Sequence, residues 1–313
     1  MPKTVLFHRD FRRFTGGHLK VWHYFEHVRS SPRHRARIVF SDETSWDATN
    51  PWSTLRGQAL PSWRTDDADV LFLAGLDWEV LDPAERRSPP KPVINLIQHV
   101  RHADPAQPLY RYLEHPAVRI CVSVSVSEAL RRTGRVNGPL ITIPNGLESA
   151  ELPPPVPQDH RTVDLLVVGI KQPTLAVEIA DRLGRTRPEM RVQVLTEPVA
   201  RSLFLEMLAR ARLAVLLPHR TEGFYLPALE GFALETLTIC PDCVGNRGFC
   251  VPDETCLMPN YTVDALLGAV QKAMTLSSAD RHRILSRART VANTHSLGEE
   301  RRAFLEVLEQ VTQ

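Results

Sequence analysis

Residues 213–235 read LAVLLPHRTEGFYLPALEGFALE, and this stretch decides the fold. The apolar run 213–217 is typical of a strand buried on both faces, as in a parallel sheet. A short polar turn follows, and Pro227 is well placed for the first turn of a helix that we expect over 227–234. A strand that passes directly into a helix is the repeating unit of an α/β fold.

The same alternation of short apolar runs and helical segments extends over the rest of the chain, which favours parallel sheets flanked by helices. Strands are expected at 5–7, 37–40, 70–73, 93–97, 119–124, 140–143, 164–168, 191–195, 213–217 and 236–240. Helices are expected at 17–28, 127–133, 175–183, 199–211, 227–234, 263–275, 278–291 and 296–311.

A proline-rich segment divides this alternation into two halves. The chain has 313 residues, which fits two domains of about 150 residues each. Residues 149–159 contain three consecutive prolines, which favour an extended, semi-rigid linker. We therefore expect an α/β protein with Rossmann-like domains at 1–148 and 160–295, a cleft between them, and a helical C-terminal segment at 296–313.

Charge and hydropathy exclude several classes of protein. The net charge is only +2, which gives no preference for nucleic acid. The apolar runs are far shorter than the roughly 20 residues that span a bilayer, and the first run is too short for an export signal. Five cysteines, an odd number, fit a reducing compartment, so we expect a cytoplasmic protein. Arginine clusters at 29–37 and 131–135 are typical of solvated faces, and they leave open contact with a phosphate-bearing acceptor or the inner membrane face.

The start of the helix predicted over 227–234 is suited to an anion. Free backbone amides at 223–226 would point beyond the helix N-terminus, where a diphosphate is favoured by hydrogen bonds and by the helix dipole. Glu222 stands just before this turn and Glu230 lies one turn inside the helix. A carboxylate can accept hydrogen bonds from both hydroxyls of a ribose, which suits Glu230. The alternative is a surface glutamate pair that flanks an ordinary turn.

The segment EGFYLPALEGFA resembles the E-x7-E signature of retaining GT-B glycosyltransferases of family 4, commonly EGFGLPxLEAxAxG. The matching residues are Glu222, Gly223, Phe224, Leu226, Pro227, Leu229, Glu230 and Ala233. The resemblance implies that Glu222 contacts the donor sugar, that the amides after Gly223 hold the diphosphate, and that Glu230 binds the ribose. The sequence departs from the pattern at Tyr225, where glycine is usual and a tyrosine would narrow the sugar pocket, at Gly231, where alanine is usual, and at Glu235, where glycine is common.

Other segments resemble the same family. Residues 143–146, IPNG, are similar to the turn that closes its first domain, and 121–130, CVSVSVSEAL, to the strand and serine-capped helix before that turn. Residues 14–20, FTGGHLK, resemble its N-terminal glycine loop, in which Gly16 and Gly17 would let the backbone approach a phosphate or the acceptor. A plain tight turn is the alternative for this glycine pair.

Two further side chains gain a role from the resemblance. Lys171 would neutralise the donor diphosphate, with Ile170 in the place of the usual arginine and Arg220 or Arg247 as further sources of positive charge. His99, at the end of the strand 93–97, would touch the donor sugar, and His102 is the second choice. The alternatives are a solvated loop lysine and a structural histidine.

The resemblance implies a metal-independent, retaining, hexosyltransferase-like enzyme. It also implies that the C-terminal helix, 296–313, crosses back to the first domain. Its donor would be a nucleoside-diphosphate sugar, bound as a substrate with no cofactor. Its acceptor would be a glycan, a lipid-linked sugar or a small molecule, in surface polysaccharide or glycan assembly. Two rival hypotheses remain: another GT-B enzyme, such as a sugar epimerase or phosphorylase, and a catalytically silent GT-B domain that binds a glycan or a partner protein.

Three groups of residues raise the question of a metal, and we expect none to hold one. Asp67-Ala68-Asp69 has a D-x-D pattern, but it directly precedes a strand, where solvent-facing aspartates are ordinary. Cys240, Cys243, Cys250 and Cys256 lack the paired C-x2-C knuckles of common zinc sites, so a zinc or redox role for them is only the alternative. The N-terminal histidines His8, His18, His23 and His27 are irregularly spaced.

Overall fold

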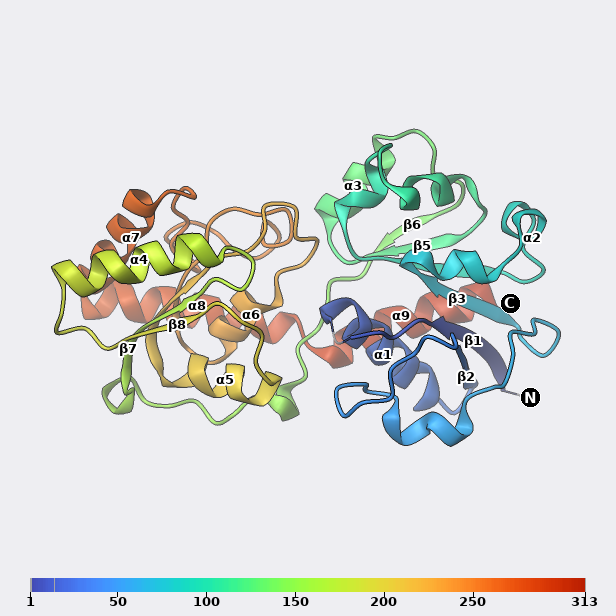
Figure 1. The fold of residues 1–313 in the computed structure, drawn as a ribbon, viewed down its shortest axis with the longest axis horizontal. Helices are drawn as coiled ribbons and strands as arrows, with labels where there is room; N and C mark the ends of the chain where they lie inside the picture. Colours follow the sequence, from blue (N-terminus) through green and yellow to red (C-terminus); the bar gives the residue numbers. More distant parts are fainter. Residues whose placement is uncertain (1, 14, 313) are drawn as a thin grey trace. The chain divides into compact units, whose positions relative to one another are not determined.

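The computed structural model describes residues 2–13 and 15–312, which form two α/β units (Figure 1). The first unit consists of Met1–Pro144 together with Gly298–Gln313, and the second of Asn145–Leu297. Phe14, in the predicted glycine loop, lies outside the described residues.

The first unit is built on a parallel sheet with the strand order β2-β1-β3-β4-β5-β6. The central strands β3 and β4 are fully buried and apolar except for Asn95, as expected where helices cover both faces. Their bounds are β1 Lys3–Arg9, β2 His34–Phe40, β3 Val70–Ala74, β4 Val93–Ile97, β5 Val118–Cys121 and β6 Leu140–Thr142. The α-helices of this unit are α1 Gly16–Arg29, α2 Pro83–Arg87, α3 Val124–Arg131 and α9 Leu297–Val311.

The C-terminal helix α9 packs into the first unit through buried contacts. Phe304 is fully buried, and its ring meets the ring of Tyr24 edge-on at 4.7 Å between centroids. The buried carboxylate of Glu300 pairs with Lys20 at 2.6 Å and with His27 at 3.2 Å, both on α1. A buried carboxylate is tolerable only when it is paired in this way, so these contacts fix the register of α9 against α1.

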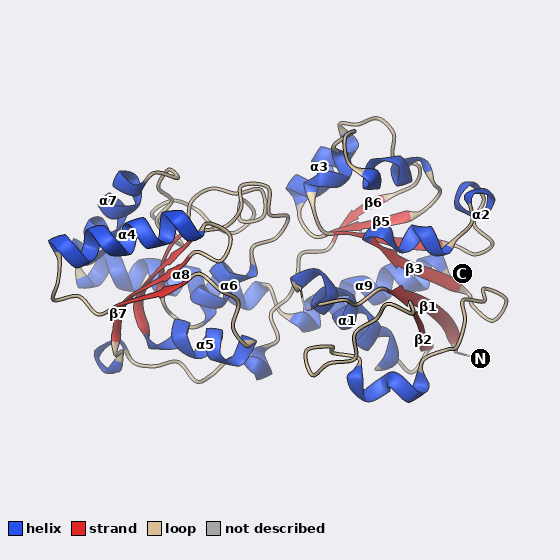
Figure 2. Ribbon diagram, in the orientation of Figure 1, coloured by secondary structure: helices blue, strands red, loops and turns tan. Residues whose placement is uncertain are grey.

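The second unit has a parallel sheet with the order β10-β9-β7-β8. Helices cover both of its faces (Figure 2): α4 and α7 lie on one side, and α5 and α6 on the other. The strands are β7 Val163–Val168, β8 Val192–Leu195, β9 Ala211–Leu216 and β10 Leu237–Ile239. The helices are α4 Pro173–Thr186, α5 Arg201–Arg210, α6 Leu226–Ala233, α7 Val263–Thr275 and α8 Ser278–Thr294.

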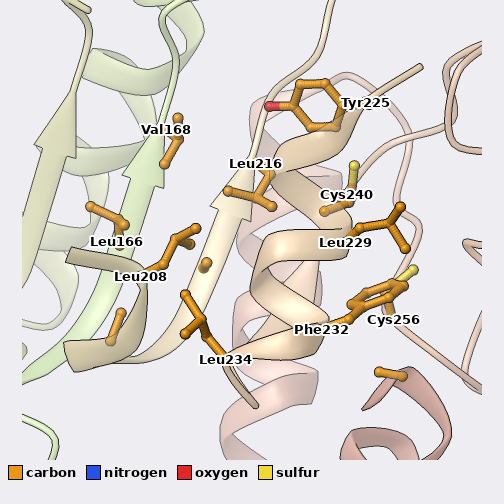
Figure 3. Close-up of a cluster of buried hydrophobic side chains, with 14 of the residues drawn as sticks. Leu166, Val168, Leu208, Leu216, Tyr225, Leu229, Phe232, Leu234, Cys240 and Cys256 are labelled. Carbon is orange, nitrogen blue, oxygen red and sulfur yellow. The ribbon is translucent and has the colours of Figure 1, made fainter. Parts of the chain in front are cut away.

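Helix α6 is anchored by the apolar core between it and the sheet. Its Leu229 and Phe232 are fully buried in one cluster with Leu216 of β9 (Figure 3). Each fully buried side chain of this size stabilises the fold by roughly 1.5–3 kcal/mol. The core therefore fixes the helix, and with it the N-terminus of α6 at the carboxyl end of β9.

The boundary between the units differs from the expected linker. Residues 149–159 belong to the second unit, because Leu152 and Val156 pack against its core. The side-chain amide of Gln158 also donates a hydrogen bond to the carbonyl of Glu235 at 2.8 Å. The proline-rich segment therefore packs on the surface of the second unit. The first unit ends at Pro144, inside the IPNG turn.

Candidate functional site

The turn between β9 and α6 places Glu222 and two unpaired amides at the carboxyl end of the second sheet. The amide of Glu222 donates to the carbonyl of His219 at 3.0 Å, which closes the turn. The Glu222 side chain is half-buried, and its carboxylate has no ion-pair partner among the described residues. The amides of Gly223 and Phe224 likewise have no hydrogen-bond partner in the described part of the chain. Unpaired amides at a helix N-terminus favour an anion.

Tyr225 does not supply a free amide, contrary to the expectation. Its N–H donates to the carbonyl of Gly245 at 3.1 Å. Its side chain is only 5% exposed and belongs to the core cluster around α6 (Figure 3), so it packs into the interior rather than forming an open pocket wall. Leu226, the first residue of α6, also packs against this core, through its side chain.

Glu230 lies on the first turns of α6 and is almost completely buried, at 1% exposure. Its Oε1 pairs with Nη1 of Arg201, the first residue of α5. The Nε of Arg201 donates in turn to Glu151 at 2.6 Å. Burial raises the pKa of Glu230, and the nearby Arg201 charge opposes that rise. A buried carboxylate with a cation beside it can accept strong hydrogen bonds from a ligand.

Lys171 emerges from the neighbouring strand at the same edge of the sheet. Strands β7 and β9 pair with Val168 opposite Leu216, so the turns that follow them leave the sheet side by side. The turn after β7 is tight, since a β-carbon on Gly169 would lie 2.2 Å from that of Ala176 on α4. Lys171 is exposed, and its amine has no ion-pair partner among the residues that the structure describes.

The two other candidate cations differ in their surroundings. Arg247 donates to both carboxylate oxygens of Asp242, at 2.9 and 2.7 Å, so its charge is already compensated. The guanidinium of Arg220 lies over the ring of Tyr261, 4.2 Å from the centroid. The Tyr261 hydroxyl donates to the carbonyl of Pro218 at 3.0 Å, which fixes this ring beside the turn. Arg220 therefore keeps its charge available at the β9–α6 turn.

The cysteine-containing loop supports that turn. The amide of Val244 donates to the carbonyl of Arg220 at 3.0 Å. The four cysteines of this region are buried as free thiols, and Cys240 accepts a hydrogen bond from Asn246 at 3.3 Å. Burial raises the pKa of Cys243 to about 12, so its thiol stays protonated. No group of side chains with a geometry for holding a metal is found among residues 2–13 and 15–312.

In the first unit, the candidate residues lie at the carboxyl ends of β1 and β4. Gly16 and Gly17 open α1, and neither has a positive φ. A β-carbon on Gly16 would meet no atom of the protein within 4 Å, so the fold itself does not require glycine there. The Gly17 carbonyl accepts a hydrogen bond from the Gln98 side chain at 3.1 Å, which ties the start of α1 to the end of β4.

The two candidate histidines of the first unit have different environments. His99 caps a short 3-10 helix, since its Nδ1 accepts from the amide of Arg101 at 3.0 Å. With Nδ1 as acceptor, the neutral ring carries its proton on Nε2. His102 is 5% exposed, and burial lowers its pKa to about 3, so it is a neutral core residue rather than a second donor-sugar ligand.

The other residues considered for a metal have structural partners. Asp69 accepts from the amide of Thr4 at 2.8 Å and pairs with Lys3 at 3.1 Å, which fixes the start of β3 against β1. His8 lies 3.3 Å from Asp77. His23 and His27 are buried on α1.

Sequence reasoning missed the residues that support the site from a distance. Arg201 pairs directly with Glu230, and Glu151 acts on Glu230 through Arg201. Gln98 and Gly245 support the backbone at the start of α1 and at the β9–α6 turn. No local pattern marks these side chains. The buried glutamate itself is the one signal, because a charge inside a helix that packs on a sheet requires a partner.

No protein-family model matches this chain, and no curated protein sequence matches it. Solved structures do match over its full length. Sucrose-phosphate synthase (tll1590) from Thermosynechococcus elongatus has a TM-score of 0.73 at 14% identity, over 99% of this chain and 99% of its own. A glycosyltransferase from Rickettsia africae ESF-5 has a TM-score of 0.67 at 13% identity, over 100% and 99%. Anabaena Alr3699/HepE, in complex with UDP-glucose, has a TM-score of 0.72 at 12% identity, over 98% and 99%.

These neighbours are GT-B glycosyltransferases, and the predicted fold class is confirmed: the chain has the two-domain, Rossmann-like GT-B fold. Identities of 14% and below establish the fold alone, because one fold carries many activities. The activity has to be argued from the residues at the carboxyl ends of the strands.

Proposed function

We propose that this protein is a metal-independent glycosyltransferase that transfers a sugar from a nucleoside-diphosphate sugar to an acceptor hydroxyl. The observation that carries the proposal is the N-terminus of α6, where the amides of Gly223 and Phe224 have no hydrogen-bond partner among the described residues, at the same edge of the sheet as the turn with the exposed Lys171. Amides and one lysine are suited to a diphosphate, and the buried Glu230 is suited to a ribose.

In this proposal, the protein's own groups stabilise the leaving diphosphate. The bond between the anomeric carbon and the phosphate oxygen breaks, and negative charge grows on the diphosphate. Preorganised amides and the Lys171 ammonium bind this charge more strongly as it develops, which lowers the barrier. The acceptor oxygen forms the new bond to the anomeric carbon, and its proton passes to the departing phosphate oxygen on the same face. The anomeric configuration is thereby retained, as the resemblance to family 4 implies.

The remaining assignments belong to the same proposal. Glu222 faces the donor sugar, with Arg220 as a further cation, while Gly16, Gly17 and His99 serve the acceptor or the donor sugar from the first unit. UDP-glucose is the first donor to test, because Anabaena HepE was solved with it. No helix among the described residues is long and apolar enough to cross a bilayer. We place the enzyme in the cytoplasm, at the inner membrane face when its acceptor is lipid-linked, in polysaccharide or glycan assembly.

Calorimetric titration of the protein with UDP, GDP and ADP in EDTA tests the site. We expect one nucleotide to bind one-to-one without a divalent metal, and to bind more weakly to Glu230→Ala. If binding appears only with manganese, the metal-independent site is wrong. Binding without any donor turnover would instead identify a silent GT-B domain.

Product analysis tests the stereochemistry. Proton NMR of the sugar released from an α-linked donor distinguishes the two anomers before they interconvert. The α anomer as first product supports retention, and the β anomer contradicts it.

A further inference from the structure

Glu230 has an unusual environment for a carboxylate that is expected to bind a ligand. It is 1% exposed, within a helix whose neighbouring positions pack into the apolar core. Its Oε1 is paired with Arg201, and its Oε2 accepts no hydrogen bond from the described residues. The ion pair with Arg201 therefore fixes Oε1, while Oε2 is available to accept a hydrogen bond from a ligand.

Arg201 is itself held from a second direction. Its Nε donates to Glu151 at 2.6 Å, while its Nη1 pairs with Glu230. Glu151 ends the short 3-10 helix Ser149–Glu151, in the segment that the sequence suggested was a linker. One planar guanidinium thus bridges two carboxylates from different elements, and its fork geometry restricts both of them.

The ionisation of Glu230 depends on this bridge. Burial raises the pKa of Glu230, Arg201 opposes that rise, and Glu151 adds to it. These are the charged groups that face the Glu230 carboxyl from the elements packed around it. Without the guanidinium, a carboxyl this deeply buried would take up a proton at a higher pH.

We propose that Arg201, anchored by Glu151, is a positioning residue that keeps Glu230 ionised and orients its Oε2 toward the ribose of the donor. The inference rests on the proposed function, and it names the residue on which recognition of the ribose depends. Arg201 acts through Glu230 and needs no contact with the nucleotide. A protonated or rotated Glu230 would lose its charge-assisted hydrogen bonds to the ribose, and with them the preference for a ribonucleotide.

The experiment compares Arg201→Gln with Arg210→Gln as the matched control. Arg210 lies on the same helix, and its one ion-pair partner among the described residues is the exposed Glu206, at 3.7 Å. For wild type and each variant, calorimetry measures the affinity for whichever of UDP, GDP or ADP binds best, and for its 2′-deoxy counterpart. Titrations are made at pH 6 and pH 8.5. Dividing each variant's affinity by the wild-type value at the same pH removes the titration of the phosphate itself.

For Arg201→Gln we expect about a tenfold loss of nucleotide affinity or more at pH 8.5, and a larger loss at pH 6. The preference for the ribonucleotide over its 2′-deoxy form should disappear. Arg210→Gln should match wild type in both respects. A merely structural pair between α5 and α6 would affect stability without removing the discrimination between the two sugars.

Two further variants keep the inference testable if Arg201→Gln does not fold. Arg201→Lys retains the positive charge. Its nucleotide affinity relative to wild type should therefore change little between pH 6 and pH 8.5, although we expect it to be a few fold lower than that of wild type. Glu151→Gln should give a smaller loss than Arg201→Gln with the same sign. If Arg201→Gln or Arg201→Lys keeps wild-type affinity and sugar discrimination at both pH values, the inference is overturned and the proposed function stands. If the wild type binds none of the three nucleotides, the proposed function fails, and the inference fails with it.

Discussion

Gly245 lies against the backbone of Phe224 so closely that a β-carbon on it would be 2.5 Å from the Phe224 amide nitrogen. The same β-carbon would be 2.6 Å from the carbonyl oxygen of Glu222. No real side chain fits at such distances, so the loop after β10 and the turn before α6 form one compact unit. The amide that we assign to the donor phosphate is therefore held by a contact between segments about twenty residues apart in the sequence.

Replacing Gly245 with alanine should disturb this turn. The backbone of 222–224 would have to move by several tenths of an ångström, and preorganised donors lose much of their effect when displaced. We expect at least a tenfold loss of nucleotide affinity, with some loss of stability, measured by calorimetry and urea unfolding. Gly248→Ala is the control, because a β-carbon there meets nothing within 4 Å. Equal behaviour of the two variants would contradict the role of Gly245.

Lys171→Ala should reduce turnover more than donor binding. Charge on the diphosphate increases as the glycosidic bond breaks, and the apolar Ile170 adds no positive charge beside Lys171. We expect kcat to fall on the order of a hundredfold, with a smaller change in donor affinity, and Lys171→Arg to recover part of the rate. Steady-state kinetics with a saturating donor checks this.

The control for this prediction is Lys272→Ala, which removes a lysine whose ion pair in the described part of the chain is with Asp253, on the surface. If Lys171→Ala turns over normally, the compensating charge lies elsewhere. Arg220 is then the next candidate, because Arg247 is already paired with Asp242.

The strands were predictable because a buried parallel strand leaves a continuous apolar run. The expected strand 93–97 coincides with β4, and the expected helix 227–234 is shifted by one residue from α6. The packing of residues 149–159 could not be predicted, because prolines restrict the backbone but do not determine what it packs against. Leu152 and Val156 decide this, through contacts with a core that is distant in sequence.

The candidate site was predictable only where its residues are local. The β9–α6 turn and Lys171 each follow a strand directly, so the apolar runs of those strands predict that both lie at the carboxyl edge of the sheet. The pairing of Arg201 with Glu230 joins two helices, and no spacing rule gives it. Glu235 has φ of 55°, a left-handed conformation at the end of α6 that ordinarily favours glycine.

Glu230→Ala should weaken binding of the nucleotide by about 1.5–3 kcal/mol, because the ribose loses a charged acceptor. Glu235→Gln, just after the same helix, should change nucleotide affinity little, because Glu235 pairs with Arg289 and not with Arg201. Calorimetric titration with the best-binding nucleotide gives both values. Unchanged affinity in Glu230→Ala would remove this residue from the site.

The buried pairs of Glu300 predict a specific sensitivity to acid. Burial opposes ionisation of this carboxyl, but Lys20 and His27 outweigh it and lower its pKa to about 2. Because the folded pKa is depressed from its usual value of about 4.3, the stabilisation is fully present above that pH and is lost as pH falls toward 2. This group alone should remove on the order of 3 kcal/mol from the free energy of unfolding over that range.

Urea unfolding at several pH values checks this prediction with the double variant Lys20→Met, Glu300→Leu. Replacing Lys20 together with Glu300 avoids leaving the buried lysine charge unpaired. The double variant should lose less stability than wild type between pH 5 and pH 2. The same pH dependence in both proteins would contradict the assignment.

The most direct test of the central claim is the rate at which nucleoside diphosphate is released from nucleotide sugars in EDTA. Wild type would be compared with Lys171→Ala and Glu230→Ala across UDP-, GDP- and ADP-sugars, without and with candidate acceptors. We predict slow release from one donor class by wild type, faster release when the acceptor is present, and a large loss of rate in both variants. Release from none of the donors, or an equal rate in wild type and both variants, would contradict it.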